Sequence, residues 1–145
     1  MRRDSPDDRS VVLWAAECAE HVIGHFEQIR PTDDRPRRAI EAARAWVRGE
    51  LEAGQAREAA FAAHSAARDC EHDAARAAAR AAGHAAASTH VADHAGRAAA
   101  YAVAAATHAA DPTSAAAAAT AERDWQDRQL PASLRAVVLP GRGPD

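Results

Sequence analysis

Cysteine and histidine side chains at helical spacing are the features of this sequence most able to do chemistry. Cys18, His21 and His25 are three and four residues apart, so a helix would project all three from one face, one turn after Trp14. Thiolate and imidazole groups bind zinc, but a zinc site needs about four ligands, and one helix rarely directs three to one ion. We therefore favour a half-buried polar seam, with Cys18 in the core and the histidines bonded to backbone or glutamate groups.

A second histidine group lies near the middle of the chain. His90 and His94 are one helical turn apart, and they would have to converge on Cys18 to complete a metal site. Val91 stands where the zinc-protease helix motif has glutamate, which argues against such a protease. His84 and His90 lie among small residues, which favours a space-filling role. General acid or base catalysis by a histidine stays open as an alternative.

A compact group of arginines, Arg35, Arg37 and Arg38, follows the pair Asp33–Asp34. Guanidinium groups suit carboxylates and phosphates, so a nucleic-acid site is one interpretation. We favour local ion pairs that hold a helix start, with Arg37 and Arg38 both in helical reach of Glu41.

Tryptophans and a charged stripe complete the candidate residues. Trp46 and Trp125 lie among apolar neighbours and are expected, like Trp14, to anchor the core. Arg44 belongs to a charged stripe on the same predicted helix as Trp46. A binding site is expected to draw on Trp14, Cys18, His21, His25, Arg35, Arg37, Arg38, Arg44, Trp46, His84, His90 and His94. The sequence assigns no catalytic residue, no metal ligand and no cofactor.

Start and stop signals predict the helices that carry these side chains. A Ser-Pro signal at residues 5–6 begins the first helix, which stops at Pro31. The second helix should close with Gly54 in the left-handed conformation. The second helix is expected over residues 35–51, and later helices over residues 55–69 and 114–129. Residues 73–110 could form one long helix or two, and we favour two that divide near Ser88, because Ser88–Thr89 could cap a new start. A short turn is expected at residues 133–138.

These elements predict an all-α, single-domain antiparallel bundle of about six helices, with a solenoid-like stack as the alternative. No strand alternation is visible. We divide the chain into a flexible N-terminus (1–9), an alanine-rich helical domain (10–139) and a disordered tail (140–145).

The composition limits what such a bundle can do. Alanine supplies 44 of the 145 residues, so the core must rely on close helix contacts around a few bulky anchors. The net charge of -3 argues against a nucleic-acid binder or an acidic-membrane binder. Two cysteines and no recognisable signal peptide favour a soluble cytoplasmic protein.

Three stretches resemble a known family. They are Leu-Trp-Ala-Ala-Glu-Cys-Ala-Glu-His at residues 13–21, the run from Asp33 to Glu50, and Ala-Gly-His-Ala-Ala-Ala-Ser-Thr-His-Val-Ala-Asp-His-Ala at residues 82–95. Together they resemble the immunity proteins of bacterial polymorphic toxin systems, which are small, alanine-rich and all-helical. The resemblance extends roughly over residues 12–139 and implies neutralisation of a toxin.

We therefore expect a protein that binds and blocks a cognate toxin without catalysis. Acidic surfaces such as Glu17, Glu20 and Glu27, or the pair Asp7–Asp8, could meet a basic toxin face. The alternative is a small helical enzyme or ligand-binding accessory protein with an interior pocket lined by His, Trp and Arg. No membrane partner is expected, nucleic acid is disfavoured, and a homodimer through the nearly uncharged residues 98–110 stays open.

Overall fold

The computed structural model describes residues 6–139, and this part of the chain is all-α and forms one domain. Within it lie eight helices and no strand. The helices are α1 (Pro6–Val22), α2 (Gly24–Ile29), α3 (Arg35–Val47), α4 (Ala53–Arg68), α5 (Asp73–Ala87), α6 (Asp93–Ala109), α7 (Ala115–Gln129) and α8 (Ala132–Val138). The predicted fold class is confirmed.

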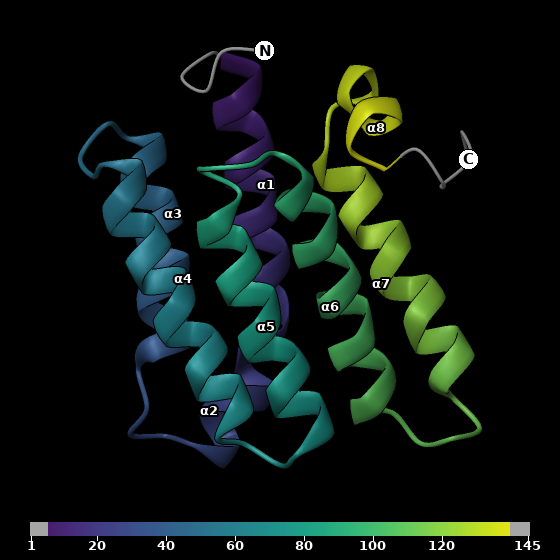
Figure 1. Ribbon diagram of the computed structural model, residues 1–145. Coiled ribbons are helices and arrows are strands. Elements are labelled where there is room, and N and C mark those ends of the chain that lie inside the picture. The colour runs from purple at the N-terminus through teal and green to yellow at the C-terminus, as the bar shows by residue number, and fades with distance from the viewer. Residues whose placement is uncertain (1–5, 140–145) are drawn as a thin grey trace.

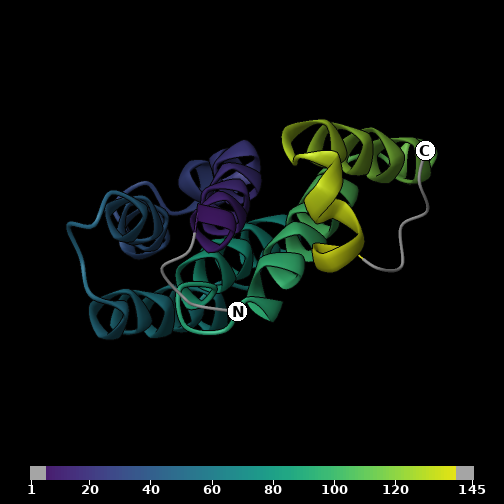
Figure 2. The same cartoon turned by 90° about the horizontal axis from the view of Figure 1, so that it is seen from above.

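The helices form two layers, which are seen from above in Figure 2. One layer contains α4, α5 and α6, and the other contains α3, α1 and α7 (Figure 2). Helix α5 is central, because it packs against α1, α2, α3, α4 and α6. From α4 to α7 successive helices run antiparallel, as their order along the colour scale shows (Figure 1). Helices α1 and α7 both pack on α6 from the other layer (Figure 2).

The core consists mainly of alanine methyl groups. On α5, for example, Ala75, Ala78 and Ala82 are fully buried. Trp14 and Phe26 are among the largest fully enclosed side chains. Small residues let helix backbones approach closely, so many shallow contacts replace the interlocking of large side chains.

Several helix boundaries differ from the prediction. The first predicted helix is divided at Ile23 into α1 and α2, and residues 132–138 form helix α8 instead of a turn. These two changes account for eight helices in the described range where about six were expected. The predicted domain boundary at residue 10 falls inside α1, which begins at Pro6. The Ser5 cap and the tail at residues 140–145 lie outside the described residues.

The glycine that closes α3 is Gly49, and the prediction of Gly54 was wrong. Gly49 has a φ of 78°, in the left-handed region that a residue with a Cβ rarely adopts. Gly54 instead lies in the first turn of α4, where Glu52 and Gln55 form a capping box.

The predicted division near Ser88 is confirmed, although Ser88 and Thr89 act differently from the expectation. They do not cap the start of α6. Their hydroxyls donate to the carbonyl oxygens of Ala85 and Ala86, at 2.6 and 2.8 Å, and so satisfy the last turn of α5. Both side chains are buried.

The His64 ring of α4 packs directly against the backbone of α5 at Gly83. A Cβ at this position would lie 2.6 Å from Cε1 of His64. The Gly83→Ala substitution should lower the free energy of unfolding by about 1 kcal/mol, because the clash outweighs the gain in helix propensity. In a His64→Ala background the same change should be neutral or stabilising. Urea unfolding of the four proteins measures both effects, and equal costs in the two backgrounds would contradict the prediction.

Candidate functional site

A groove runs between α1 and α7 on the side of α6 that both helices cover. It contains two adjoining hollows of about 250 and 170 Å³, which share Glu17 and Gln129. The larger hollow is also lined by Glu20, His21, Arg44 and Trp125. The smaller hollow is also lined by Ser10, Leu13, Trp14 and Pro131. We call this feature the α1–α7 groove.

The attachment of α7 beneath the groove is polar. Its buried side chains are Glu122 and Gln126. The indole Nε1 of Trp14 donates to the carbonyl oxygen of Gln126 at 2.8 Å, and the Gln126 amide donates to the carbonyl oxygen of Ala99 at 2.9 Å. These bonds join α7 to α1 and α6, so they set the width of the groove.

One wall of the groove is an aromatic stack. His21 and Trp125 lie with ring centroids 3.7 Å apart and an interplanar angle of 5°. The His21 Nδ1 lies 2.8 Å from Oε2 of Glu122, which is 7% exposed. Trp125 is only half-buried. The stack therefore presents a fixed, partly accessible indole to whatever enters the groove.

The rim of the groove carries both charge signs. Glu20 accepts hydrogen bonds from Arg37 and from Arg44, and Arg37 also bonds Glu27 at 2.9 Å. Burial raises the pKa of Glu20, but the hydrogen bonds from the two arginines outweigh it, so the pKa is lower than usual. Glu17 differs, because no hydrogen bond or ion pair joins it to another side chain in residues 6–139. The groove thus holds one carboxylate available to a partner.

The arginine cluster at the start of α3 is paired internally. Arg35 bonds Asp33 and Asp69 at 2.7 and 3.1 Å, and Arg38 bonds Asp34 at 2.7 Å. The Arg35 guanidinium holds the pKa of Asp33 below its usual value. The expected local ion pairs are therefore present at Arg35 and Arg38.

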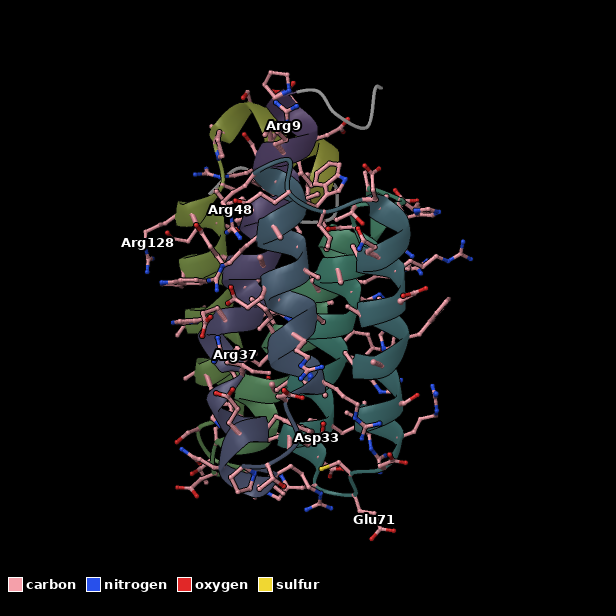
Figure 3. The ribbon with its side chains drawn as sticks, turned by 90° about the vertical axis from the view of Figure 1, so that its left-hand side faces the viewer. Arg9, Asp33, Arg37, Arg48, Glu71 and Arg128 are labelled. Atoms are coloured by element: carbon pink, nitrogen blue, oxygen red, sulfur yellow. The ribbon has the colours of Figure 1, made fainter. Side chains whose placement is uncertain are left out.

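The predicted contacts with Glu41 were wrong. Arg37 bonds Glu20 and Glu27 from other helices, and the residue that bonds Glu41 is Arg44, at 2.9 Å. Figure 3 shows Arg37 on the side of α3 that faces α1, with Asp33 below the start of α3. The Arg37 side chain reaches Glu20 because α3 packs beside α1.

The N-terminal cysteine and histidine group does not form one cluster. Cys18 is fully buried in the core, whereas His21 points to α7 and is 39% exposed. His25 lies half-buried in α2, and Trp46 packs half-buried against the core from α3. Of the predicted residues, the groove therefore brings together Trp14, His21 and Arg44.

The second histidine group forms a separate cluster with a residue that the sequence did not single out. His64 of α4 contacts His84 edge-on at 4.8 Å, and His84 stacks on Tyr101 of α6 at 5.2 Å. The Nδ1 atoms of His84 and His94 are 2.8 Å apart, so one ring donates and the other accepts. His90 is exposed. Because this cluster lies on α4, α5 and α6, it shares no pocket with His21.

The histidine cluster is held in its neutral form. Burial lowers the pKa of His84 to about 3, and the neighbouring His64, His94, Arg97 and Arg80 add to the effect. Burial also lowers the pKa values of His64 and His94. No group of three or more His, Cys, Asp or Glu side chains within residues 6–139 is arranged to hold a metal ion.

The depressed pKa values predict a loss of stability in acid. The unfolded chain takes up protons near the ordinary histidine pKa of about 6.5, while the folded His84 does so only near pH 3. The free energy of unfolding should therefore fall as the pH drops below about 6.5. Between pH 7 and 5 we expect His84 to account for about 1 kcal/mol, because its partial exposure screens the charge.

Thermal melts at pH 7.5, 6 and 5 measure this slope. His84→Gln should flatten it, and His90→Gln is the matched control, since His90 is exposed. A slope that is the same in wild type and His84→Gln would contradict the assignment.

Some groove residues were missed by sequence reasoning. Gln126 and Glu122 are polar residues one turn apart on α7, and Gln129 and Trp125 lie beside them. The available signal was the weak apolar stripe of α7, in which Trp125 is the only bulky apolar side chain. A helix with so little apolar surface must be attached through polar groups.

The fold and groove together describe a small all-α protein with an open, mixed-charge surface site. The chain belongs to the Imm-5 like putative immunity protein family, whose model matches residues 4–133. No curated protein and no solved structure matches the chain. Among the described residues, no helix has both the length and the apolar character needed to cross a membrane.

Proposed function

We propose that this protein is an immunity protein that binds its cognate toxin through the α1–α7 groove and blocks it by occupying its surface, without catalysis. The match to the immunity family over residues 4–133 carries the proposal. The groove supports the location, because it combines apolar contact area with an available charge. The cytoplasm of the toxin-producing cell is where such a complex would protect.

The chemistry of the groove favours a basic toxin surface. Leu13 is 39% exposed at the smaller hollow and offers apolar contact area. Glu17 lies where the two hollows meet, and the half-buried indole of Trp125 lines the larger one. A lysine or arginine side chain of the toxin could pair with the carboxylate and contact the indole face. Charge complementarity of this kind steers and fixes toxin complexes.

The proposal is tested by co-expression with the toxin gene that neighbours this one. Protected growth and a complex that survives size-exclusion chromatography are the expected results. Continued killing with no complex would remove the proposal. Blocking without catalysis also predicts that the purified protein leaves the toxin chemically unaltered, which intact mass spectrometry of the recovered toxin checks.

The groove residues make weak candidates for the alternative of a small enzyme. That alternative requires Cys18, His21 or His25 to point into the same cavity as His84, His90 or His94. The structure instead places His21 against α7, and His84 and His94 between α5 and α6. The interior pocket lined by His, Trp and Arg is therefore not formed by these residues.

A further inference from the structure

A third hollow lies on the opposite layer of the protein, between α5 and α6. Its volume is about 200 Å³. The lining side chains are Asp73, Arg76, Ala77, Arg80, Tyr101, Ala104 and His108. Ala77 of α5 and Ala104 of α6 line the hollow with methyl groups, which fill less space than larger side chains would. We call this feature the α5–α6 hollow.

The α5–α6 hollow contains two guanidinium groups that form no ion pair within residues 6–139. Arg76 and Arg80 are one turn apart on α5, so both guanidinium groups reach the same side of the helix. The Nε of Arg76 donates to the carbonyl oxygen of Cys70 at 2.8 Å, which leaves its terminal nitrogens available. Arg80 is half-buried and makes no hydrogen bond or ion pair within residues 6–139.

The positive charge of Arg80 contributes to lowering the pKa values of two neighbouring histidines. His64 has a lowered pKa chiefly because of burial and next because of Arg80, and Arg80 also contributes at His84. His84 stacks on Tyr101, which lines the hollow. The cationic hollow is thus backed by neutral rings that cannot supply a counterion.

Other groups in the hollow add polar contacts of the kind that a phosphate ester uses. Tyr101 and His108 lie on one face of α6, two turns apart, and offer hydroxyl and imidazole groups. Asp73 lies one turn before Arg76, and its carboxylate can accept a hydrogen bond from a hydroxyl group at the end of the hollow. The Asp73 carboxylate would repel a large polyanion that filled the hollow. A single phosphate group bound at Arg80 would lie away from that carboxylate and be repelled less.

We propose that the α5–α6 hollow binds the phosphate group of a small phosphomonoester, with Arg80 and Arg76 holding the dianion and Asp73 accepting a hydroxyl group of the ester. This site is separate from the α1–α7 groove and does not depend on toxin binding. Guanidinium forks match phosphate oxygens in geometry as well as charge, which makes Arg80 the principal ligand.

Isothermal titration calorimetry at constant ionic strength tests the proposal, with ribose 5-phosphate and inorganic phosphate as probes against a chloride background. Ribose 5-phosphate should bind more tightly than inorganic phosphate, and Asp73→Ala, which removes the hydrogen-bond acceptor, should abolish that preference. Arg80→Gln should weaken phosphate binding at least tenfold, and Arg80→Lys should recover part of the loss.

The matched control is Arg128→Gln, which removes the same charge from α7, where Arg128 projects into solvent (Figure 3). This control should bind both probes as the wild type does. Equal weakening in Arg128→Gln and Arg80→Gln would show general charge attraction and overturn the proposal. No heat of binding with either probe up to 10 mM would overturn it too. Circular dichroism melts verify that each variant is folded, and toxin protection by Arg80→Gln should match wild type.

Discussion

Replacing Trp14 with alanine is expected to lower the free energy of unfolding by about 3–5 kcal/mol, the usual cost of removing a large aromatic side chain from a core. Trp14 is 2% exposed and is one of few bulky anchors in a core made largely of methyl groups. The substitution would leave a cavity that alanine neighbours are too small to fill. It would also remove the hydrogen bond to the carbonyl oxygen of Gln126, and so loosen α7.

Chemical denaturation monitored by circular dichroism measures this loss. Trp14→Phe is the control, because it keeps an aromatic ring in the core while it removes the indole N–H and part of the ring volume, at an expected cost of about 1–3 kcal/mol. The half-buried Trp46 should cost less on truncation than Trp14, since it lies at the edge of the core. A Trp14→Ala protein within about 1 kcal/mol of wild type would show that the alanine contacts alone hold the bundle.

Reversing the charge at Glu17 is expected to weaken the complex with the cognate toxin by about a hundredfold. Glu17 lines both hollows of the α1–α7 groove and has no partner in the described part of the chain. In Glu17→Arg, an attraction to a basic toxin side chain becomes a repulsion at the centre of the contact. Fold stability should change little, because no internal ion pair is broken.

Surface plasmon resonance with the co-purified toxin measures the effect. Glu58→Arg is the matched control, since Glu58 is exposed on α4, away from the groove. The affinity of Glu58→Arg for the toxin should stay within about twofold of wild type, because a charge far from the contact surface changes binding little. Equal losses in both variants would assign the effect to total charge, and unchanged binding in Glu17→Arg would move the toxin contact to another face.

Helix boundaries were predictable from the sequence where the residues at a helix end marked it clearly. The division near Ser88 was predictable from Ser88–Thr89 as residues that can end or begin a helix, although their hydroxyls satisfy the last turn of α5 and do not cap α6. The break at Ile23 was not, because neither a proline nor a capping side chain marks it. Gly49 and Gly54 are both close to the end of α3, and sequence alone does not say which of them takes the positive φ.

The candidate site was less predictable, because it depends on contacts between distant residues. Trp14 meets Gln126 across 112 residues, and His21 meets Glu122 across 101. Periodicity placed His21 on the same face as Cys18, but it carried no information on which helix would cover that face. The two hollows that Glu17 lines are formed in part by residues of α7, so the sequence alone did not indicate that Glu17 lies between them.

The polar attachment of α7 has a consequence for how such a protein can diversify. Because its buried side chains are Glu122 and Gln126, few large apolar groups connect it to the alanine core. Its outward positions, Ala116, Ala117, Ala121 and Arg128 among them, are exposed. Related chains can therefore change the residues of α7, which forms one wall of the groove, while the packing of the other helices is kept. Under the proposed function, recognition of a different toxin could therefore evolve on α7 at a small cost in the free energy of folding.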